Sequence, residues 1–183
     1  MESDICDILV SEDAIKARVA ELGQEISDYY RNEELFIIWI MNGALLFTAD
    51  LIRNITIPVK IDCIRVENRR NNRDSEYQPD FRWNMNLDIE DQCVLLVDDI
   101  FDTGKTLLRV VRGLKELRPK SIETCVLLDK QTDRPILETP NYVGFQIEDQ
   151  FVVGYGLDFA EQYRHLPYIG VLHPELQNPP EWV

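Results

Sequence analysis

The chain has 183 residues, a length that suits one compact domain with a buried core. Hydrophobic residues make up 45% of it and charged residues 28%, which argues against a disordered or fibrous protein. The net charge of −14 and the pI near 4.5 disfavour a basic surface for a phosphate backbone, so we expect no nucleic-acid partner.

Hydrophobic spacing predicts alternating helices and strands at the start of the chain. Ser11 can cap a helix whose apolar residues recur at helical spacing through about Tyr30. The run LFIIWIM at 35–41 predicts a buried strand, which Asn42-Gly43 ends. We then expect a helix over 44–55 and a strand over 59–66.

A long polar stretch follows at about 67–91 and contains the sequence NRRNNRD. A loop of this length in a compact domain is usually a functional lid or disordered. We expect a mobile lid that closes over a ligand, because its guanidinium groups suit contact with phosphate. The alternative is a solvated loop in which basic and acidic side chains balance. The arginines concerned are Arg69, Arg70 and Arg73.

Strands and a helix also alternate in the second half. We expect one helix over 103–117 and strands over 94–97, 122–128, 142–145, 150–154 and 168–172. Such alternation predicts an α/β fold with a mostly parallel central sheet flanked by helices. With no internal repeat and no linker in view, we expect a single domain over 1–183, ending in an irregular tail.

The start of the chain and its cysteines predict a reduced, cytoplasmic protein. The first ten residues are acidic and lack the basic-then-apolar order of a signal peptide. The longest apolar run is too short to cross a bilayer, so we expect no membrane partner. The four cysteines form no CxxC pair and no histidine cluster accompanies them, which argues against a zinc site.

The segment VLLVDDIFDTGKTL at 94–107 is the most informative. An apolar strand runs directly into Asp98 and Asp99, and a short turn leads to an apolar helix. Ligands bind beyond the carboxyl ends of strands in open α/β sheets. The N–H groups of the helix start, with the hydroxyls and glycine of DTGKT, form a cradle for a phosphate monoester. The two carboxylates can bind the hydroxyls of a sugar, or a magnesium ion through water.

Other phosphate motifs do not fit. A Walker A loop needs a glycine five residues before Gly104, where Asp99 stands. A dinucleotide motif needs a third glycine after Gly154 and Gly156, where Phe159 stands. Asp-Thr-Gly alone is compatible with an ordinary helix cap and turn. The paired carboxylates at the end of a buried strand favour a ligand site instead.

The same segment resembles the motif that binds phosphoribosyl pyrophosphate (PRPP) in type I phosphoribosyltransferases. VLLDK at 126–130 and FVVGYGLDFAEQYRHLPYIGVL at 151–172 are similar to the purine-reading and hood segments of the hypoxanthine-guanine phosphoribosyltransferases. AIKARVAELGQEISDYY and MNGALLFTADL match that family's first helix and first active-site loop more loosely. The resemblance implies the type I fold, with a small hood formed by the N-terminal and C-terminal segments and a flexible lid loop at about 67–91.

The resemblance assigns the PRPP side of a site. Asp98 and Asp99 are expected to bind the ribose hydroxyls and the magnesium shell. Asp102 is expected to face N7 of the purine as general acid/base. The residues expected to wrap the 5′-phosphate are Asp102, Thr103, Gly104, Lys105 and Thr106, and those expected at the pyrophosphate are Asn42, Gly43 and Arg164.

The purine side rests on the resemblance too. Lys130 is expected to donate to the purine O6, since an ammonium is only a donor and suits a 6-oxo group. Phe151 is expected to stack on the base, and the backbone of Val152 to bond its edge. Asp158 is expected beside the purine as the ligand of a second magnesium ion.

The implied enzyme is a magnesium-dependent glycosyltransferase of purine salvage, assembled as a homodimer or homotetramer. It would transfer the 5-phosphoribosyl group of PRPP to hypoxanthine, guanine or xanthine and release pyrophosphate. Two positions depart from the family: Asn42 replaces a frequent basic residue, and Asn68-Arg69 stand near the place of a Ser-Tyr pair in the lid. Two alternatives remain, a transferase for another base and a regulatory protein that has lost catalysis.

Overall fold

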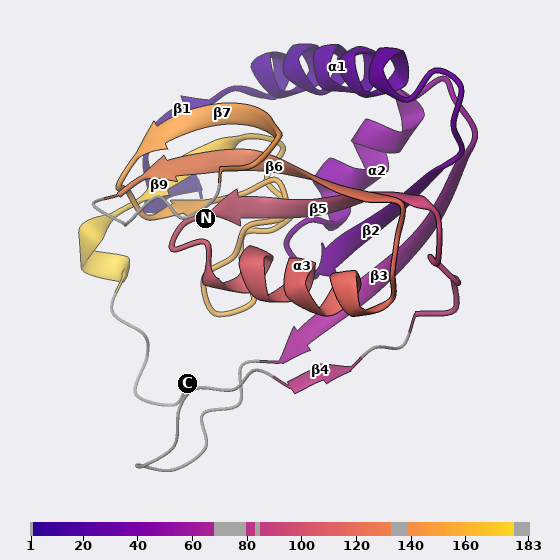
Figure 1. Ribbon diagram of the computed structural model, residues 1–183. Helices are drawn as coiled ribbons and strands as arrows, with labels where there is room; N and C mark the ends of the chain where they lie inside the picture. Colours follow the sequence, from indigo (N-terminus) through magenta and orange to yellow (C-terminus); the bar gives the residue numbers. More distant parts are fainter. Residues whose placement is uncertain (1, 68–79, 83–84, 133–138, 178–183) are drawn as a thin grey trace.

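The computed structural model of the chain describes residues 2–67, 80–82, 85–132 and 139–177. Within these residues the larger sheet has six strands, which are β2 (Leu35–Met41), β3 (Val59–Glu67), β4 (Asp80–Arg82), β5 (Cys93–Phe101), β6 (Ser121–Gln131) and β7 (Tyr142–Glu148). They lie in the order β4-β3-β2-β5-β6-β7 (Figure 1). β4 pairs antiparallel with β3, and the other pairs are parallel. The expected mostly parallel α/β sheet is confirmed.

Both faces of this sheet are covered, which explains its near-continuous apolar strands. Leu35 and Ile37 of β2 belong to the core on one face, and Phe36 and Ile38 to the core on the other. Successive residues of a strand point to opposite faces, so this alternation follows from the pleat. The first core is closed by α1 (Glu12–Tyr29) and α2 (Leu45–Arg53), and the second by α3 (Lys105–Glu116) (Figure 1).

The helices form close to where spacing predicts them. The side chain of Ser11 accepts a hydrogen bond of 3.3 Å from the N–H of Ala14, which caps α1 as expected. The helix buries one stripe that includes Ile15, Val19 and Leu22, and its charged residues other than the half-buried Arg18 are exposed. In the part of the chain that the structure describes, no helix has both the length and the apolar character needed to cross a bilayer.

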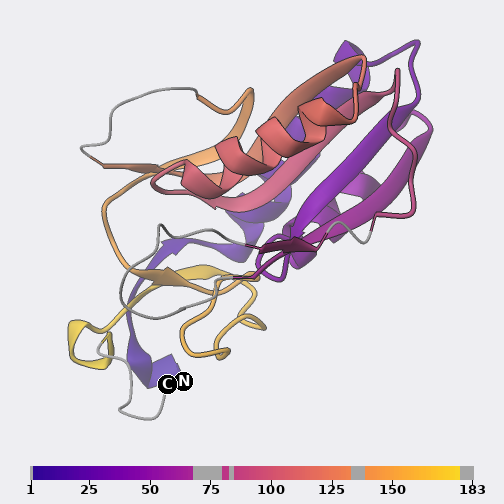
Figure 2. The ribbon, with the colours of Figure 1, turned by 60° about the horizontal axis from the view of Figure 1, so that its bottom comes forward.

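A second, antiparallel sheet joins the two ends of the chain. It consists of β1 (Ile5–Val10), β9 (Ile169–Leu172) and β8 (Val152–Val153), in the order β1-β9-β8. Figure 2 shows these strands set apart from the larger sheet. Strand β1 was not predicted. Its polar residues, among them Asp7, hide the strand in the sequence, and it is held by pairing with a segment near the other end of the chain.

Strand β5 extends further than predicted, into the acidic residues of the site. The expected strand 94–97 runs on to Phe101, because Asp98, Ile100 and Phe101 still pair with β6. The carboxylates of Asp98 and Asp99 therefore belong to the end of the strand rather than to a turn after it. Their directions are fixed by the ladder.

The polar stretch 67–91 is not one loop. Residues 80–82 form β4, and Met85, Leu87 and Ile89 pack on the core beside α3. Their spacing of two residues places them on the same side of the segment. Residues 68–79 and 83–84 lie outside the described residues. The expected lid contacts, with the three arginines and the Asn68-Arg69 pair, fall there.

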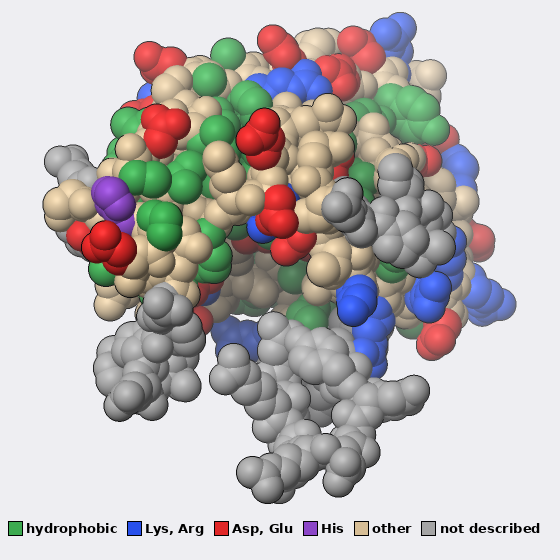
Figure 3. All heavy atoms as spheres, turned by 90° about the vertical axis from the view of Figure 1, so that its left-hand side faces the viewer, with side chains coloured by type: hydrophobic (Ala, Val, Ile, Leu, Met, Phe, Trp, Pro, Cys, Tyr) green, Lys and Arg blue, Asp and Glu red, His purple; other side chains and the backbone are tan. Residues whose placement is uncertain are grey.

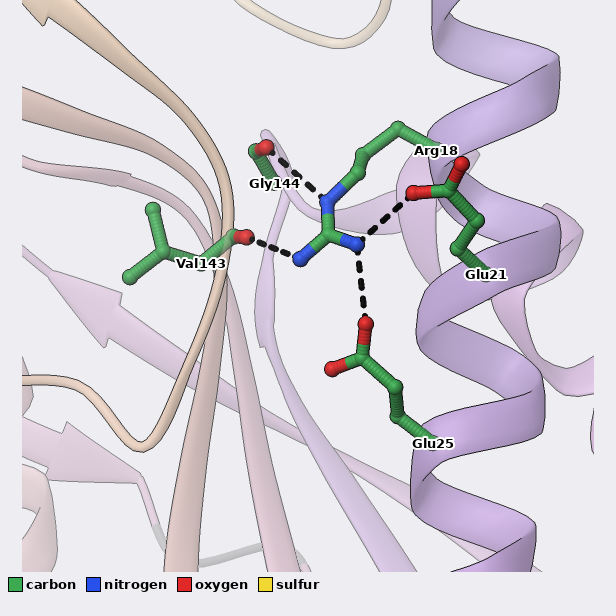
Figure 4. A network of polar contacts seen from close by, with 5 residues as sticks. All are labelled: Arg18, Glu21, Glu25, Val143 and Gly144. Atoms are coloured by element: carbon green, nitrogen blue, oxygen red, sulfur yellow. Dashed lines mark hydrogen bonds and ion pairs between the residues drawn. The ribbon is translucent and has the colours of Figure 1, made fainter.

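Helix α1 is tied to the edge of the sheet by one arginine. Figure 4 shows the guanidinium of Arg18 pointing at the backbone of β7, where it donates to the carbonyls of Gly144 at 3.2 Å and Val143 at 2.9 Å. The same group pairs with Glu21 and Glu25, each at 2.9 Å. A planar guanidinium can reach all four acceptors at once, which a single ammonium cannot.

Arg18→Lys should therefore lower the free energy of unfolding by about 1–3 kcal/mol, since hydrogen bonds to the half-buried carbonyls of β7 are lost. Urea unfolding measures this directly. The matched control is Arg31→Lys, because Arg31 makes an exposed pair with Asp28 at 3.1 Å. Its replacement should cost no more than about 0.5 kcal/mol. Equal losses in the two variants would show that the contacts to β7 carry no special stability.

Candidate active site

A cavity of about 490 Å³ lies at the carboxyl ends of β2 and β5. Figure 3 views the side of the molecule toward which β5 and β6 run, and the surface is hollowed there. Many of the residues predicted to form a site line this cavity together: Asn42, Gly43, Asp98, Asp99, Asp102, Thr103, Gly104, Thr106, Asp158 and Arg164. Lys105, Lys130, Phe151 and Val152 are not among the residues that line it.

Two adjacent carboxyl groups, Asp98 buried and Asp99 half-buried, line the cavity at the end of β5. Asp98 is 6% exposed, and its Oδ1 accepts a 3.0 Å hydrogen bond from the N–H of Asp99. Oδ1 of Asp99 accepts one of 2.9 Å from the N–H of Ile100. Burial raises the pKa of Asp98 well above its ordinary value, and the adjacent charge of Asp99 adds to the rise. Burial also raises the pKa of Asp99, against the opposing charge of Arg164. A bound cation or hydroxyl donor would favour the ionised pair.

The raised pKa of Asp98 gives a pH-dependent prediction for the ligand-free protein. Because the pKa of Asp98 is raised in the folded state, its protonated carboxyl lets the fold keep its full stability at acid pH. That stability is lost as the pH rises through the raised pKa and the buried carboxyl ionises. Asp98→Asn cannot ionise, so it should be more stable than the parent at neutral pH, by a margin that grows from acid to neutral pH. Urea unfolding across a pH series tests this, with the exposed Asp88→Asn as control. A margin that is constant with pH would contradict it.

The start of α3 offers backbone donors to the cavity. Gly104 is the N-cap, with φ of 73°, and it brings no capping side chain. A Cβ there would lie 2.8 Å from the ring of Phe101, so the position suits glycine for space as well as conformation. Asp-Thr-Gly thus forms a turn whose glycine is the N-cap of α3, without a side-chain cap hydrogen bond. The first N–H groups of the helix stay available to an anion.

The loop after β2 packs directly on the carboxyl pair. Its Met41–Asn42 peptide bond is cis. A Cβ on Gly43 would lie 1.7 Å from Oδ2 of Asp99, and a Cβ on Gly156 would lie 2.1 Å from the carbonyl oxygen of Gly43. The loop is thus held between β5 and the segment after β8 at contact distance.

Arg164 brings a positive charge to the same rim. Its guanidinium pairs with Asp158 and with Glu161, both at 2.9 Å, and donates to the carbonyl of Gly156 at 2.9 Å. Sequence reasoning did not include Glu161, which lines the cavity as well. The spacing of three residues between Glu161 and Arg164 is the signal that could have found it.

Of the other predicted residues, Lys130 lies next to Asp102. The Nζ of Lys130 lies 4.0 Å from Oδ2 of Asp102 and 2.7 Å from Oδ1 of Asp149, which sequence reasoning missed. Phe151 is 38% exposed, with its ring edge-to-face on Phe159 at 5.5 Å between centroids. Val152 is buried, and its backbone pairs with β9.

Comparison with known proteins agrees with this geometry. The phosphoribosyl transferase domain family matches residues 7–160. The chain is 39% identical over 174 residues to the hypoxanthine-guanine phosphoribosyltransferase of Bacillus subtilis, covering 95% of this chain and 97% of that protein. It is 38% identical to the hypoxanthine phosphoribosyltransferase of Salmonella typhimurium over 90% and 93% of the two chains. The chain belongs to the phosphoribosyltransferase family, in its hypoxanthine-guanine branch.

Solved phosphoribosyltransferase structures confirm the type I fold. The hypoxanthine phosphoribosyltransferase of Staphylococcus aureus superimposes with a TM-score of 0.91 at 35% identity over 97% of both chains. The Trypanosoma cruzi enzyme in complex with the product IMP gives 0.87 at 34% identity, over 94% of this chain and 97% of that one. The bifunctional protein TilS/HprT of Listeria innocua is 37% identical over 97% of this chain, which spans 28% of that protein's length.

Proposed function

We propose that this phosphoribosyltransferase transfers the 5-phosphoribosyl group of PRPP to a 6-oxopurine in purine salvage. Hypoxanthine, guanine and xanthine are the candidate bases, and the products are the 5′-nucleotide, IMP or GMP for the first two, and pyrophosphate. The observation that carries the base class is the pair of Lys130 and Asp102, whose Nζ and Oδ2 lie 4.0 Å apart. A 6-oxopurine presents O6 and N7 side by side on one edge. The ammonium suits O6, and the carboxylate suits a proton on N7.

The cavity beside this pair has the groups that PRPP needs. Asp98 and Asp99 can accept from the ribose hydroxyls. The 5′-phosphate would bind at the start of α3, in the turn from Asp102 to Thr106. The pyrophosphate would meet the loop of Asn42 and Gly43, with Arg164 opposite. The backbone of that loop supplies donors where a basic side chain is missing.

Magnesium is the proposed cofactor, and the residues fit it in part. In the described residues no cluster of three or more His, Cys, Asp or Glu side chains could hold a metal alone. Mg²⁺ commonly uses one or two carboxylates and completes its shell with water and substrate oxygens. Asp98 and Asp99 meet that requirement, with Asp158 as the candidate for a second ion. When bound, the ion neutralises the leaving pyrophosphate.

The residues of the chain then have separable tasks in the displacement at the anomeric carbon. Asp102 takes or shares the N7 proton as the base becomes a nucleophile. Lys130 orients the base through O6, and Phe151 stacks on one face of it. The Val152 backbone bonds the far edge. Water must stay out of the closed site, since it would hydrolyse PRPP.

Lys130→Ala should lower kcat/KM for hypoxanthine at least about tenfold and leave the weak rate with adenine unchanged, since an unmet polar group costs about 1–3 kcal/mol. Initial rates of nucleotide formation with hypoxanthine, guanine, xanthine, adenine and uracil measure this and test the proposed base class. The control is Lys120→Ala, which removes an exposed ammonium paired with Glu33. Comparable kcat/KM for adenine and hypoxanthine in the parent enzyme would rule out a 6-oxopurine transferase.

Assembly and location are part of the same proposal. A homodimer or homotetramer and a cytoplasmic location fit an enzyme that draws on free bases and PRPP. A transferase for another base would show its highest kcat/KM with adenine or uracil rather than with a 6-oxopurine. A regulatory protein without catalysis would bind PRPP and form no nucleotide.

A further inference from the structure

The proposed pyrophosphate subsite has two walls, the Asn42–Gly43 loop with α2 and the turn at 154–156 with Arg164. A buried phenol connects them. The hydroxyl of Tyr155 donates to Oδ2 of Asp50 at 2.6 Å. Tyr155 lies in the turn after β8, and Asp50 lies in α2, the helix that follows the Asn42–Gly43 loop. The hydrogen bond therefore spans 105 residues and joins segments on either side of the cavity.

On the first wall, α2 carries the loop. The N–H of Leu45 donates to the carbonyl of Asn42 at 3.2 Å, so the loop continues directly into the helix. Phe47 and Leu51 of α2 are fully buried in the core that α1 and α2 form with the sheet. A contact that holds Asp50 consequently fixes the end of the loop as well.

On the second wall, the turn around Tyr155 carries the guanidinium. Gly154, Tyr155 and Gly156 all have positive φ, of 101°, 48° and 103°. The N–H of Tyr155 donates to the carbonyl of Leu166 at 2.8 Å, and that of Gly156 to the carbonyl of Arg164 at 2.9 Å. Because the Arg164 guanidinium also donates back to Gly156, any shift of this turn moves the cation.

The two walls are in close contact at Gly43 and Gly156, where there is no space for a side chain. A Cβ on Gly156 would lie 2.1 Å from the carbonyl oxygen of Gly43. The ring of Tyr155 is 7% exposed, and burial raises the pKa of its phenol, with the Asp50 hydrogen bond adding to the rise. The hydroxyl thus remains a proton donor to the carboxylate at neutral pH.

We propose that Tyr155 and Asp50 are positioning residues that set the distance between the Asn42–Gly43 loop and Arg164, and so the affinity for the pyrophosphate end of PRPP. This inference rests on the proposed function. Neither side chain lines the cavity, so both act through the segments that they join. On the purine side, Lys130 in β6 and Asp102 after β5 lie outside the two joined segments and should not respond. Phe151 and Val152 precede the turn, but their backbones are held by β9, so they should keep their places as well.

The chain provides a matched control for a merely structural role. Tyr163 is also 7% exposed, has a positive φ of 72°, and donates its hydroxyl to a carboxylate, that of Asp4, at 3.1 Å. Its hydrogen bond ties the same C-terminal segment to the N-terminal end rather than to α2. Tyr163→Phe and Tyr155→Phe each delete one such hydroxyl and keep the ring.

The experiment compares steady-state kinetics and melting temperatures of Tyr155→Phe, Asp50→Leu, Asp50→Asn and Tyr163→Phe. Tyr155→Phe and Asp50→Leu should raise KM for PRPP about tenfold, the scale of one lost hydrogen bond to a charged group. KM for hypoxanthine should stay within about twofold. Asp50→Asn keeps an acceptor and should recover most of the affinity. The double variant Tyr155→Phe/Asp50→Leu should be no worse than Asp50→Leu alone, because Asp50→Leu already removes the bond that Tyr155→Phe deletes, together with the exposed Asp50–Arg53 ion pair.

Several results would overturn the inference. One is an active Tyr155→Phe enzyme whose KM for PRPP equals the parent value, and another is an equal rise in Tyr163→Phe. A rise in both KM values that follows the loss of melting temperature would show a structural role only. If Tyr155→Phe does not fold, the same comparisons apply to the two Asp50 variants. A parent chain that forms no nucleotide from PRPP would instead refute the proposed function, and this inference with it.

Discussion

Asp102→Asn should lower kcat about 10²- to 10⁴-fold without loss of the fold, the usual range for a positioned general acid/base. Asparagine keeps the size of the side chain and cannot take up the N7 proton. The side chain of Asp102 is 47% exposed and its Oδ2 lies 4.0 Å from Nζ of Lys130, so a change at this half-exposed position should leave the apolar core intact. Single-turnover rates with hypoxanthine and PRPP, alongside thermal unfolding, measure both parts.

The matched control for this prediction is Asp88→Asn, at an exposed carboxylate that accepts a 3.1 Å hydrogen bond from the N–H of Glu90. It should keep the parent rate. An Asp102→Asn enzyme within about threefold of the parent kcat would exclude Asp102 as the acid/base, since such a group supplies at least about 10²-fold.

Gly43→Ala should lower kcat/KM for PRPP about 10²-fold, the scale of a misplacement of about 1 Å in a reacting site. The added Cβ would lie 1.7 Å from Oδ2 of Asp99, and that carboxyl is held by β5 and by the N–H of Ile100. Either the loop or the carboxyl must move, and both face the proposed PRPP site. Steady-state kinetics with varied PRPP measure the loss.

The control adds the same methyl group elsewhere. Gly113 lies in the interior of α3, toward its C-terminal end. Gly113→Ala should keep kcat/KM and raise the free energy of unfolding by about 0.5–1 kcal/mol, through helix propensity. If Gly43→Ala retained the parent kcat/KM for PRPP, the loop would not form part of the PRPP site.

Much of the larger sheet follows from local pattern. The apolar run at 35–41 predicts β2. Helix α1 is likewise predicted by the spacing of Ile15, Val19 and Leu22, because its buried residues recur with the period of a helix. The local pattern does not predict strand β1 or the end of β5. Their residues include Asp7, Asp98 and Asp99, and they become strands because a partner strand supplies hydrogen bonds.

In the candidate site, too, the sequence predicts the groups that are contiguous in the chain but not the contacts between distant segments. The motif at 94–107 marks the carboxyl pair and the helix start, since those groups are contiguous in the chain. The partners that orient them come from distant segments. Asp149 at 2.7 Å from Lys130 and the packing of Gly43 on Asp99 both depend on the tertiary fold. The spacing of residues in the sequence predicts neither contact.

Product analysis of one reaction tests most directly whether the enzyme transfers the phosphoribosyl group to a 6-oxopurine. The chain is incubated with PRPP, Mg²⁺ and hypoxanthine, and IMP and pyrophosphate are measured in the same samples. Both products should appear in equal amounts, chelation of magnesium should stop their formation, and adenine should yield almost none. No IMP above the protein-free control, with guanine and xanthine equally inert, would contradict it.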